Sequence, residues 1–367
     1  MPSLTSADPL LAELLERRGE PVATVVFAAP GFEGDTQVRL DIRGKDVRRQ
    51  LEEAGLPSAV IERAAEAVLG HTGTDGLGIV ADRRGTLVSR LADVDESEDV
   101  IQVEALPRFV PFLRDRFEDR PLVVVRCDRV GASIARVAGG EIARDTEVAG
   151  DDEYVQKVAS GGFSQARMQR HSEHTWEQNA KEIAEAVAAE ADAVDAELVI
   201  VTGDERAVHL VAEHLPEHLR DRLVLDDHQP FDDESDAVVF DRARTLLRDR
   251  LGREIVEVLE RFGEARGRGE GAADDVGDVL AALRQGAVQT LLVSGDSGQP
   301  VHVAAEDPMQ LALDAVPLAD LGFDDVLTAR LTDAAVAAAL AGGAEVVIVP
   351  EHGPNSPSGA VGALLRY

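Results

Sequence analysis

The stretch VGDVLAALRQGAVQTLLVS, residues 276–294, predicts a helix, a tight turn and a buried strand in immediate succession. Its first half places apolar residues at the three- and four-residue steps of a helix, and Gly286 supplies a residue suited to ending it. Its second half is a short apolar run typical of a strand that is buried on both faces. Such a strand must be covered by helices, so this stretch favours an α/β fold.

The same alternation continues to both sides of this stretch. After it, residues 331–367 predict a helix, a parallel-type strand, an irregular loop and a last apolar strand. Before it, residues 238–262 predict a long helix, and the glycine-rich residues 263–273 predict a connector. We therefore expect a C-terminal domain over residues 231–367.

The middle of the chain predicts a second α/β domain over residues 120–230. It opens with a strand, a turn and a second strand, and an acid-rich loop is expected at 141–153. A long helix follows, with an apolar stripe at helical spacing. The stripe consists of Trp176, Ala180, Ile183, Val187, Ala191 and Val194. A buried strand at 197–203, a helix and another strand precede a linker at 228–236.

The first 119 residues predict a further α/β domain, which gives three consecutive α/β-type domains: 1–119, 120–230 and 231–367. Residues 21–29 predict a strand, and residues 37–43 alternate as a strand does. Two helices follow, each ending at a glycine. A strand pair is then expected across the turn at residues 82–85.

The composition limits the classes of partner. The net charge is -32, from 69 acidic and 37 basic residues, which argues against whole-surface binding to DNA or RNA and leaves only a local contact. The single cysteine, Cys127, excludes an intrachain disulfide and fits a reducing cytoplasm. We find no secretory signal and no membrane-spanning apolar run, so we expect a cytoplasmic protein with no membrane partner.

One window stands out in this acidic chain. The segment SGGFSQARMQRH, residues 160–171, lies inside an acid-free run from Gln156 to His171 that carries Lys157, Arg167 and Arg170. Glycines let a backbone approach RNA closely, and arginine binds phosphate in a bidentate manner. A simpler interpretation is a Gly-Gly turn with Ser164 capping a helix that begins at Gln165, and with arginines on a solvated face.

Two segments carry a resemblance to a known family. Residues 276–294 and the terminal GAVGALLRY resemble the start and end of the third domain of archaeal and eukaryotic class-one release factors and Pelota. That domain has a fold shared with kink-turn-binding ribosomal proteins. The segment GGFSQARMQRH resembles the Gly-Gly-Gln loop of release factors and, more closely, the Gly-Gly-(Trp/Phe)-Ser-Gln-x-Arg loop of their bacterial relatives. The resemblance makes the functional interpretation of this loop the preferred one.

The resemblance assigns roles to particular residues. Gly161 and Gly162 match the glycines that shape the loop. The family's glutamine falls on Phe163 in the strict register and on Gln165 in the serine–glutamine register, which we prefer because Ser164 and Arg167 then match as well. Gln165 would position the water that hydrolyses the peptidyl-tRNA ester. Lys157, Arg167 and Arg170 would bind RNA. No metal or other cofactor is implied.

The resemblance leaves three functions open. The first is peptidyl-tRNA hydrolysis on stalled ribosomes, with ribosomal RNA, peptidyl-tRNA and a translational GTPase as possible partners. The second is a non-catalytic hibernation factor that occupies the ribosomal A site. The third is an RNA-binding scaffold acting off the ribosome through the last domain. The first 120 residues carry no Asn-Ile-Lys-Ser-type motif, so the resemblance does not extend to codon-dependent termination.

Other candidate sites are weaker. His214 and His218 have the spacing of helical metal ligands, but Pro216 lies between them and no third ligand is evident, so exposed polar histidines are expected. Cys127 lies in an apolar strand and is expected to be a buried structural thiol. Trp176 is expected in the core. The segment VTGDERAV is expected to be an ordinary turn from strand to helix.

Overall fold

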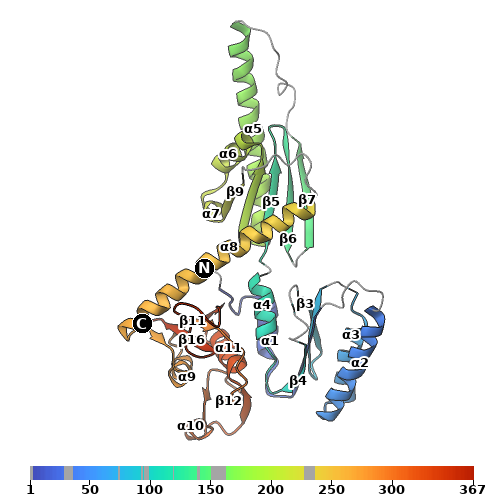
Figure 1. The fold of residues 1–367 in the computed structure, drawn as a ribbon, viewed down its shortest axis with the longest axis vertical. Helices are drawn as coiled ribbons and strands as arrows, with labels where there is room; N and C mark the ends of the chain where they lie inside the picture. Colours follow the sequence, from blue (N-terminus) through green and yellow to red (C-terminus); the bar gives the residue numbers. More distant parts are fainter. Residues whose placement is uncertain are drawn as a thin grey trace. The chain divides into compact units, whose positions relative to one another are not determined.

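The computed structural model describes residues 3–28, 36–72, 75–91, 94, 99–118, 120–138, 141–149, 163–226 and 236–367. The chain divides into two compact units (Figure 1). Unit 1 combines Met1–Glu118 with Leu251–Tyr367, and unit 2 is Asp119–Arg250. Both units contain sheets and helices, so the expected α/β class is confirmed. The division into three domains stays a prediction.

The first sheet of unit 1 is antiparallel throughout. Its elements in chain order are α1 (Pro9–Glu16), β1 (Val22–Phe27), α2 (Thr36–Glu53), α3 (Ser58–Leu69), β2 (Gly76–Ala81), β3 (Thr86–Leu91), β4 (Val100–Glu104) and α4 (Val110–Glu118). The strand order is β3-β2-β1-β4, and α2 and α3 share an apolar core with β1 and β2. The strand expected at 21–29 and the strand pair across residues 82–85 are confirmed.

Residues 37–43 form part of α2, so the strand-like interpretation of their alternation was wrong. The buried positions of α2 are Leu40, Gly44, Val47 and Leu51, which follow the four- and three-residue steps of one helix face. Val38 and Ile42, which complete the apparent alternation, are 56% and 54% exposed. These exposed apolar residues, together with the buried Leu40, produce the alternating pattern that is typical of a strand.

The second sheet of unit 1 contains the stretch that predicted the fold. Its elements are β10 (Ala272–Ala273), α9 (Val276–Arg284), β11 (Val288–Val293), α11 (Leu331–Ala341), β15 (Glu345–Ile348) and β16 (Val361–Leu365). The order is β10-β16-β11-β15, with β11 parallel to β15 and antiparallel to β16. Gly286, at φ 64°, makes the turn between α9 and β11. The helix, turn and buried strand are confirmed.

A small third sheet, β13-β12-β14, completes unit 1 with α10. The bounds are β12 Pro300–Ala304, β13 Leu311–Ala312, α10 Val316–Asp320 and β14 Val326–Arg330. The N-terminal segment also joins the second sheet of unit 1, because Leu4 forms an antiparallel bridge with Val346 of β15.

Helix α8 (Asp236–Arg268) is longer than expected. The connector predicted at 263–273 was wrong as far as Arg268, because the helix continues through Gly263. A Cβ at Gly263 would lie 2.4 Å from the side chain of Asn355, so this glycine permits close packing rather than a turn. Gly269 and Gly271, with φ values of 73° and 82°, end the helix as expected.

Unit 2 is a five-stranded mixed sheet with helices. Its elements are β5 (Leu122–Cys127), β6 (Gly131–Ala138), β7 (Glu141–Ala149), α5 (Phe163–Val194), β8 (Leu198–Gly203), α6 (Glu205–His214), α7 (Glu217–Arg220) and β9 (Leu223–Asp226). The order is β7-β6-β5-β8-β9, with β5, β8 and β9 mutually parallel. The acid-rich loop predicted from residue 141 was wrong over 141–149, because this segment pairs with β6 as an edge strand. An edge strand tolerates polar residues.

The linker was predicted at residues 228–236. Residues 228–235 lie outside the described residues, and Asp236 is the first residue of α8.

The core of unit 2 lies between the sheet and helices α5 and α6. Ala180, Ile183, Val187 and Ala191 of the predicted stripe are buried there. Trp176 is only partly buried, so its placement in the core was wrong. No helix within the described ranges is long and apolar enough to cross a lipid bilayer.

Candidate functional site

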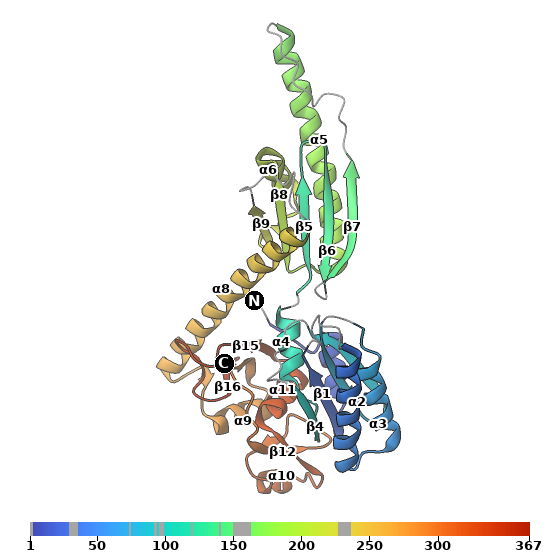
Figure 2. The same cartoon turned by 45° about the vertical axis from the view of Figure 1, so that its right-hand side comes forward.

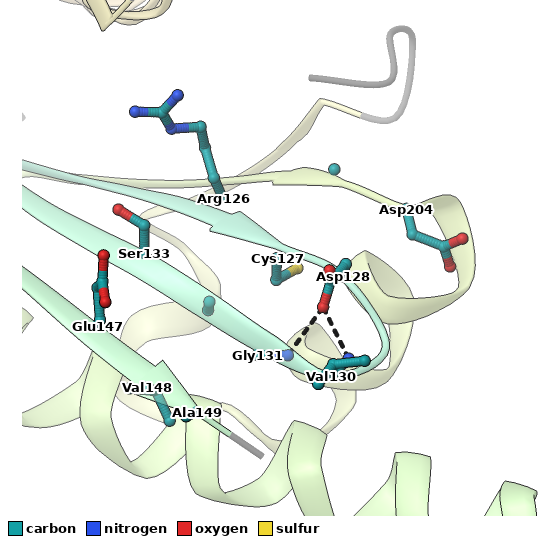
Figure 3. Close-up of a pocket in the computed structure, with 12 residues that line it drawn as sticks. Arg126, Cys127, Asp128, Val130, Gly131, Ser133, Glu147, Val148, Ala149 and Asp204 are labelled. Atoms are coloured by element: carbon teal, nitrogen blue, oxygen red, sulfur yellow. Dashed lines mark hydrogen bonds between the residues drawn. The ribbon is translucent and has the colours of Figure 1, made fainter. Parts of the chain in front are cut away.

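The carboxyl ends of β5 and β8 lie side by side at one edge of the sheet in unit 2. In the turn after β5, Asp128 Oδ1 accepts hydrogen bonds from the backbone N–H groups of Val130 and Gly131, at 2.7 and 2.8 Å (Figure 3). The N–H of Asp204 donates to the carbonyl of Cys127 at 3.0 Å. A Cβ on Gly203 would lie 1.9 Å from that same carbonyl oxygen, so only glycine fits here.

An open pocket of about 710 Å³ lies beside this edge. Arg126, Ser133 and Glu147 are cross-strand neighbours on β5, β6 and β7, and their side chains project from the same face of the sheet (Figure 3). Asp128 and Asp204 also line the pocket, so carboxylates outnumber the arginine. Carboxyl ends of parallel strands are common ligand sites in α/β folds, and the charge of this pocket does not favour an anion.

The described cysteine of the pocket, Cys127, is not an activated nucleophile. Burial, with smaller contributions from Asp128 and Asp204, raises the pKa of Cys127 to about 12. Burial opposes ionisation of Asp204, but hydrogen bonds from Arg129 and from the N–H of Ala207 outweigh it and lower the pKa of this carboxyl. Cys127 is therefore a buried structural thiol, as expected. In the described part of the chain, no group of three or more His, Cys, Asp or Glu side chains could hold a metal ion.

The predicted site residues lie in or just before the start of α5. Lys157, Gly161 and Gly162 fall outside the described residues. Ser164, Gln165, Arg167 and Arg170 lie on helical backbone, because α5 begins at Phe163, two residues before the expected start. The structure describes the backbone of these four residues and not their side chains. Figures 1 and 2 show that the first turns of α5 extend past the ends of the strands of unit 2.

The weaker histidine candidates are separated by the fold. His214 is the last residue of α6, and His218 lies in α7, which begins after Pro216. The two side chains therefore do not share one helix face. His218 instead contacts Asp192 at 3.0 Å.

Comparison with known proteins identifies the segment that contains this site. Residues 121–268 match the model of bacterial archaeo-eukaryotic release factor family 2. This segment is similar to that family. The match covers the sheet of unit 2, the Gly161–Gln165 motif and helix α8.

The similarity to curated proteins extends over nearly the whole chain. Two Mycobacterium tuberculosis proteins from different strains, the uncharacterized proteins Rv2629 and MT2704, are each 29% identical over 356 residues. Each alignment covers 95% of this chain and 93% of the relative.

Solved structures of release factors and Pelota proteins also match the chain, at low sequence identity. The archaeal translation termination factor aRF1 is 18% identical, with 99% of each chain covered and a TM-score of 0.25. Archaeoglobus fulgidus Pelota is 15% identical, with 97% of this chain and 91% of that chain covered and a TM-score of 0.33. Dom34 of S. cerevisiae is 11% identical, with 80% and 79% covered and a TM-score of 0.42. Scores below 0.5 do not establish a shared arrangement of the whole chain.

Proposed function

We propose that this protein is a ribosome-associated translation factor that hydrolyses the peptidyl-tRNA ester on stalled ribosomes. The observation that carries the proposal is the position of Ser164 and Gln165 in the first turn of α5, in an acid-free part of a chain with a net charge of -32. The family of the surrounding segment supports the same reaction. The first turns of α5 would enter the peptidyl-transferase centre.

The N-terminus of α5 supplies suitable electrostatics. The first N–H groups of a helix have no acceptor within the helix, and that of Gln165 is among them. The helix dipole also places partial positive charge at this end. Both features favour a developing oxyanion or a bound water, which is what ester hydrolysis requires. Gln165 would position the water, and Ser164 would help to shape the site.

RNA would be bound by the cations of the same window. Arg167 and Arg170 are three residues apart on helical backbone, so they lie on neighbouring positions of one face. Together with Lys157 they would contact phosphates, and Gly161 and Gly162 would let the backbone approach closely. Exclusion of bulk water by the surrounding RNA would complete the site without a metal ion.

The test uses ribosomes that carry labelled peptidyl-tRNA and an empty A site. Peptide release and ribosome binding are followed for the wild-type protein, for Gln165→Ala and for Gln178→Ala. Gln178 is an exposed glutamine farther along α5, so its variant is the matched control. We expect release by wild type and Gln178→Ala, and loss of release with retained binding for Gln165→Ala. Release by Gln165→Ala at the wild-type rate would contradict the assigned role.

A second function is favoured by one feature of the motif. In the strict Gly-Gly-Gln register the third position is Phe163, not glutamine. A protein that occupies the A site and protects idle ribosomes needs no catalytic glutamine. Tight binding of wild type and Gln165→Ala without release by either would select this function. Failure to co-sediment with ribosomes would instead favour an RNA-binding scaffold acting off the ribosome.

A further inference from the structure

We infer that Trp176 is a positioning residue that fixes the direction of the first turns of α5. Residues 163–174, here called the arm, precede Trp176 and carry the proposed catalytic glutamine. The effect on peptide release rests on the proposed function. The effect on the direction of the arm does not.

Trp176 is held by two elements other than its own helix. The guanidinium carbons of Arg129 and Arg206 each lie over the Trp176 ring, 4.8 Å from its centroid. Arg129 belongs to the turn between β5 and β6, and Arg206 to the first turn of α6. A cation over the indole face is the strongest of the cation–π pairs in proteins. The three residues form what we call the Trp176 clamp.

The clamp is itself anchored by hydrogen bonds. Arg129 donates to Asp204 through Nε at 3.1 Å, and its Nη2 lies 3.0 Å from the second carboxylate oxygen. Asp204 also caps α6 by accepting from the N–H of Ala207. Asn179 Nδ2, one turn after Trp176, donates to the carbonyl of Arg129 at 3.0 Å. Arg129 is thus tied to Asp204 and to α5, and Arg206 lies in the first turn of the helix that Asp204 caps.

The clamp lies where α5 loses its support from the sheet. Among the described side chains of α5, burial begins at Asn179, whereas His174 is exposed. Farther along, Glu190 pairs with Arg136 of β6 at 2.6 Å and accepts from Thr146 of β7. The helix is therefore fixed to the sheet along its second half, and the contacts of Trp176 with Arg129 and Arg206 lie between that half and the arm.

A small tilt of the arm about Trp176 produces a larger displacement at its far end. Residues 163–174 span ~18 Å at the rise of an α-helix, so a tilt of ~10° moves the far end by ~3 Å. Displacement of a catalytic group by about 1 Å can cost roughly a hundredfold in rate. A clamp that limits tilt would therefore affect release more than binding.

The contacts of Trp176 also show why tryptophan is used. Its Nε1 is buried and has no hydrogen-bond partner. The polar edge of the ring is therefore not what holds it, and the π faces make the specific contacts. A phenylalanine would keep a π face, whereas a leucine would keep only the apolar volume.

The experiment compares Trp176→Leu, Trp176→Phe and the control Val187→Ala. Val187 is fully buried in the core, about three helical turns beyond Trp176 along α5, so its variant should lower stability without altering the arm. Spin labels on Ser172→Cys and Glu213→Cys report the distance between the arm and α6. Cys127 is buried and is not labelled. All measurements are made well below the melting temperature of the least stable variant.

We expect Trp176→Leu to broaden the spin–spin distance distribution and to lower the single-turnover release rate at least tenfold, with ribosome affinity unchanged. Trp176→Phe should restore most of both properties, and Val187→Ala should keep both despite a lower melting temperature. An unchanged distance distribution in Trp176→Leu would overturn the inference. So would a broadened distribution with undiminished release, in a protein whose wild type releases peptide. If the wild type releases none, the proposed function fails, and the distance measurement alone decides the role of the clamp.

Discussion

The carboxylate of Asp333 accepts a hydrogen bond from the backbone N–H of Phe109 at 2.8 Å, across 224 residues of sequence. Asp333 lies in the first turn of α11 and is almost completely buried. Arg108 and Arg330 lie 3.7 and 3.4 Å from its second carboxylate oxygen. Both arginines also pair with Asp296. One buried carboxylate thus joins the N-terminal and C-terminal parts of unit 1.

Removing this carboxylate should strongly destabilise unit 1. Asp333→Ala leaves the Phe109 N–H without its acceptor and removes a carboxylate that stabilises the charge of the buried Arg108. Breaking a buried charged network of this kind costs about 3 kcal/mol. Chemical denaturation at pH 7 measures the loss. The control Asp320→Ala removes an exposed carboxylate and should change stability by less than about 0.5 kcal/mol. Equal stability of the two variants would contradict the assigned importance of the network.

The same carboxyl group should make stability depend on pH. Burial raises the pKa of Asp333 to about 6, against the opposing effects of the Phe109 N–H, Arg108 and Arg330. The unfolded pKa is about 3.9, so between these values the folded state binds more protons and the free energy of unfolding falls as pH rises.

Asp333→Asn does not titrate and provides the reference. The stability of the wild type relative to Asp333→Asn should fall by on the order of 2 kcal/mol between pH 4 and pH 7. Denaturation curves at several pH values measure this difference. A constant difference, or one that grows with pH, would show that the folded pKa of Asp333 is not raised.

Gly203 should not tolerate a side chain. Its φ is 131°, and a Cβ would lie 1.9 Å from the Cys127 carbonyl oxygen. Gly203→Ala should therefore destabilise unit 2 by roughly 3 kcal/mol. Gly252→Ala is the matched control, because Gly252 lies inside α8 with no atom within 4 Å of its Cβ position. That change should stabilise by up to about 1 kcal/mol. Thermal unfolding that ranks the two variants the other way would refute the close approach of β5 and β8.

Cys127 should resist alkylation in the folded protein. Its thiol is buried, and burial raises its pKa to about 12, so the reactive thiolate is scarce at pH 8. Intact-mass measurements after iodoacetamide treatment should show no adduct in the native state and complete modification in guanidinium chloride. Rapid native modification would mean that the end of β5 opens in solution.

Secondary structure could be predicted from the sequence where it depends on residues that are close together in the chain. The apolar runs of β5, β8 and β11 gave strands, and the spacing of Ala180, Ile183 and Val187 gave the buried face of α5. The errors came where distant contacts decide the outcome. Residues 141–149 form a strand because β6 supplies hydrogen-bond partners. Gly263 lies inside α8 and not in a connector, and the side chain of the distant Asn355 occupies the space where its Cβ would be.

The candidate site also combines features that the sequence predicts with contacts that it does not. The motif from Gly161 to Gln165 and the acid-free run around it can be found in the sequence, because they are local properties of composition. Trp176 was assigned to the core because its spacing fits the apolar stripe. Its actual neighbours, Arg129 and Arg206, come from other elements, and no local pattern could have predicted them.

The sequence by itself determined the α/β class, the order of most helices and strands, and the position of the proposed motif at the start of a long helix. Hydrophobic periodicity and glycine turns depend on residues that are close in the sequence, so they can be recognised from the sequence alone. The tertiary structure decided how buried polar groups are satisfied. Asp333 meets Phe109, and Trp176 meets two arginines, only after the chain has folded, because a buried charge or donor must find its partner wherever the fold brings one within reach.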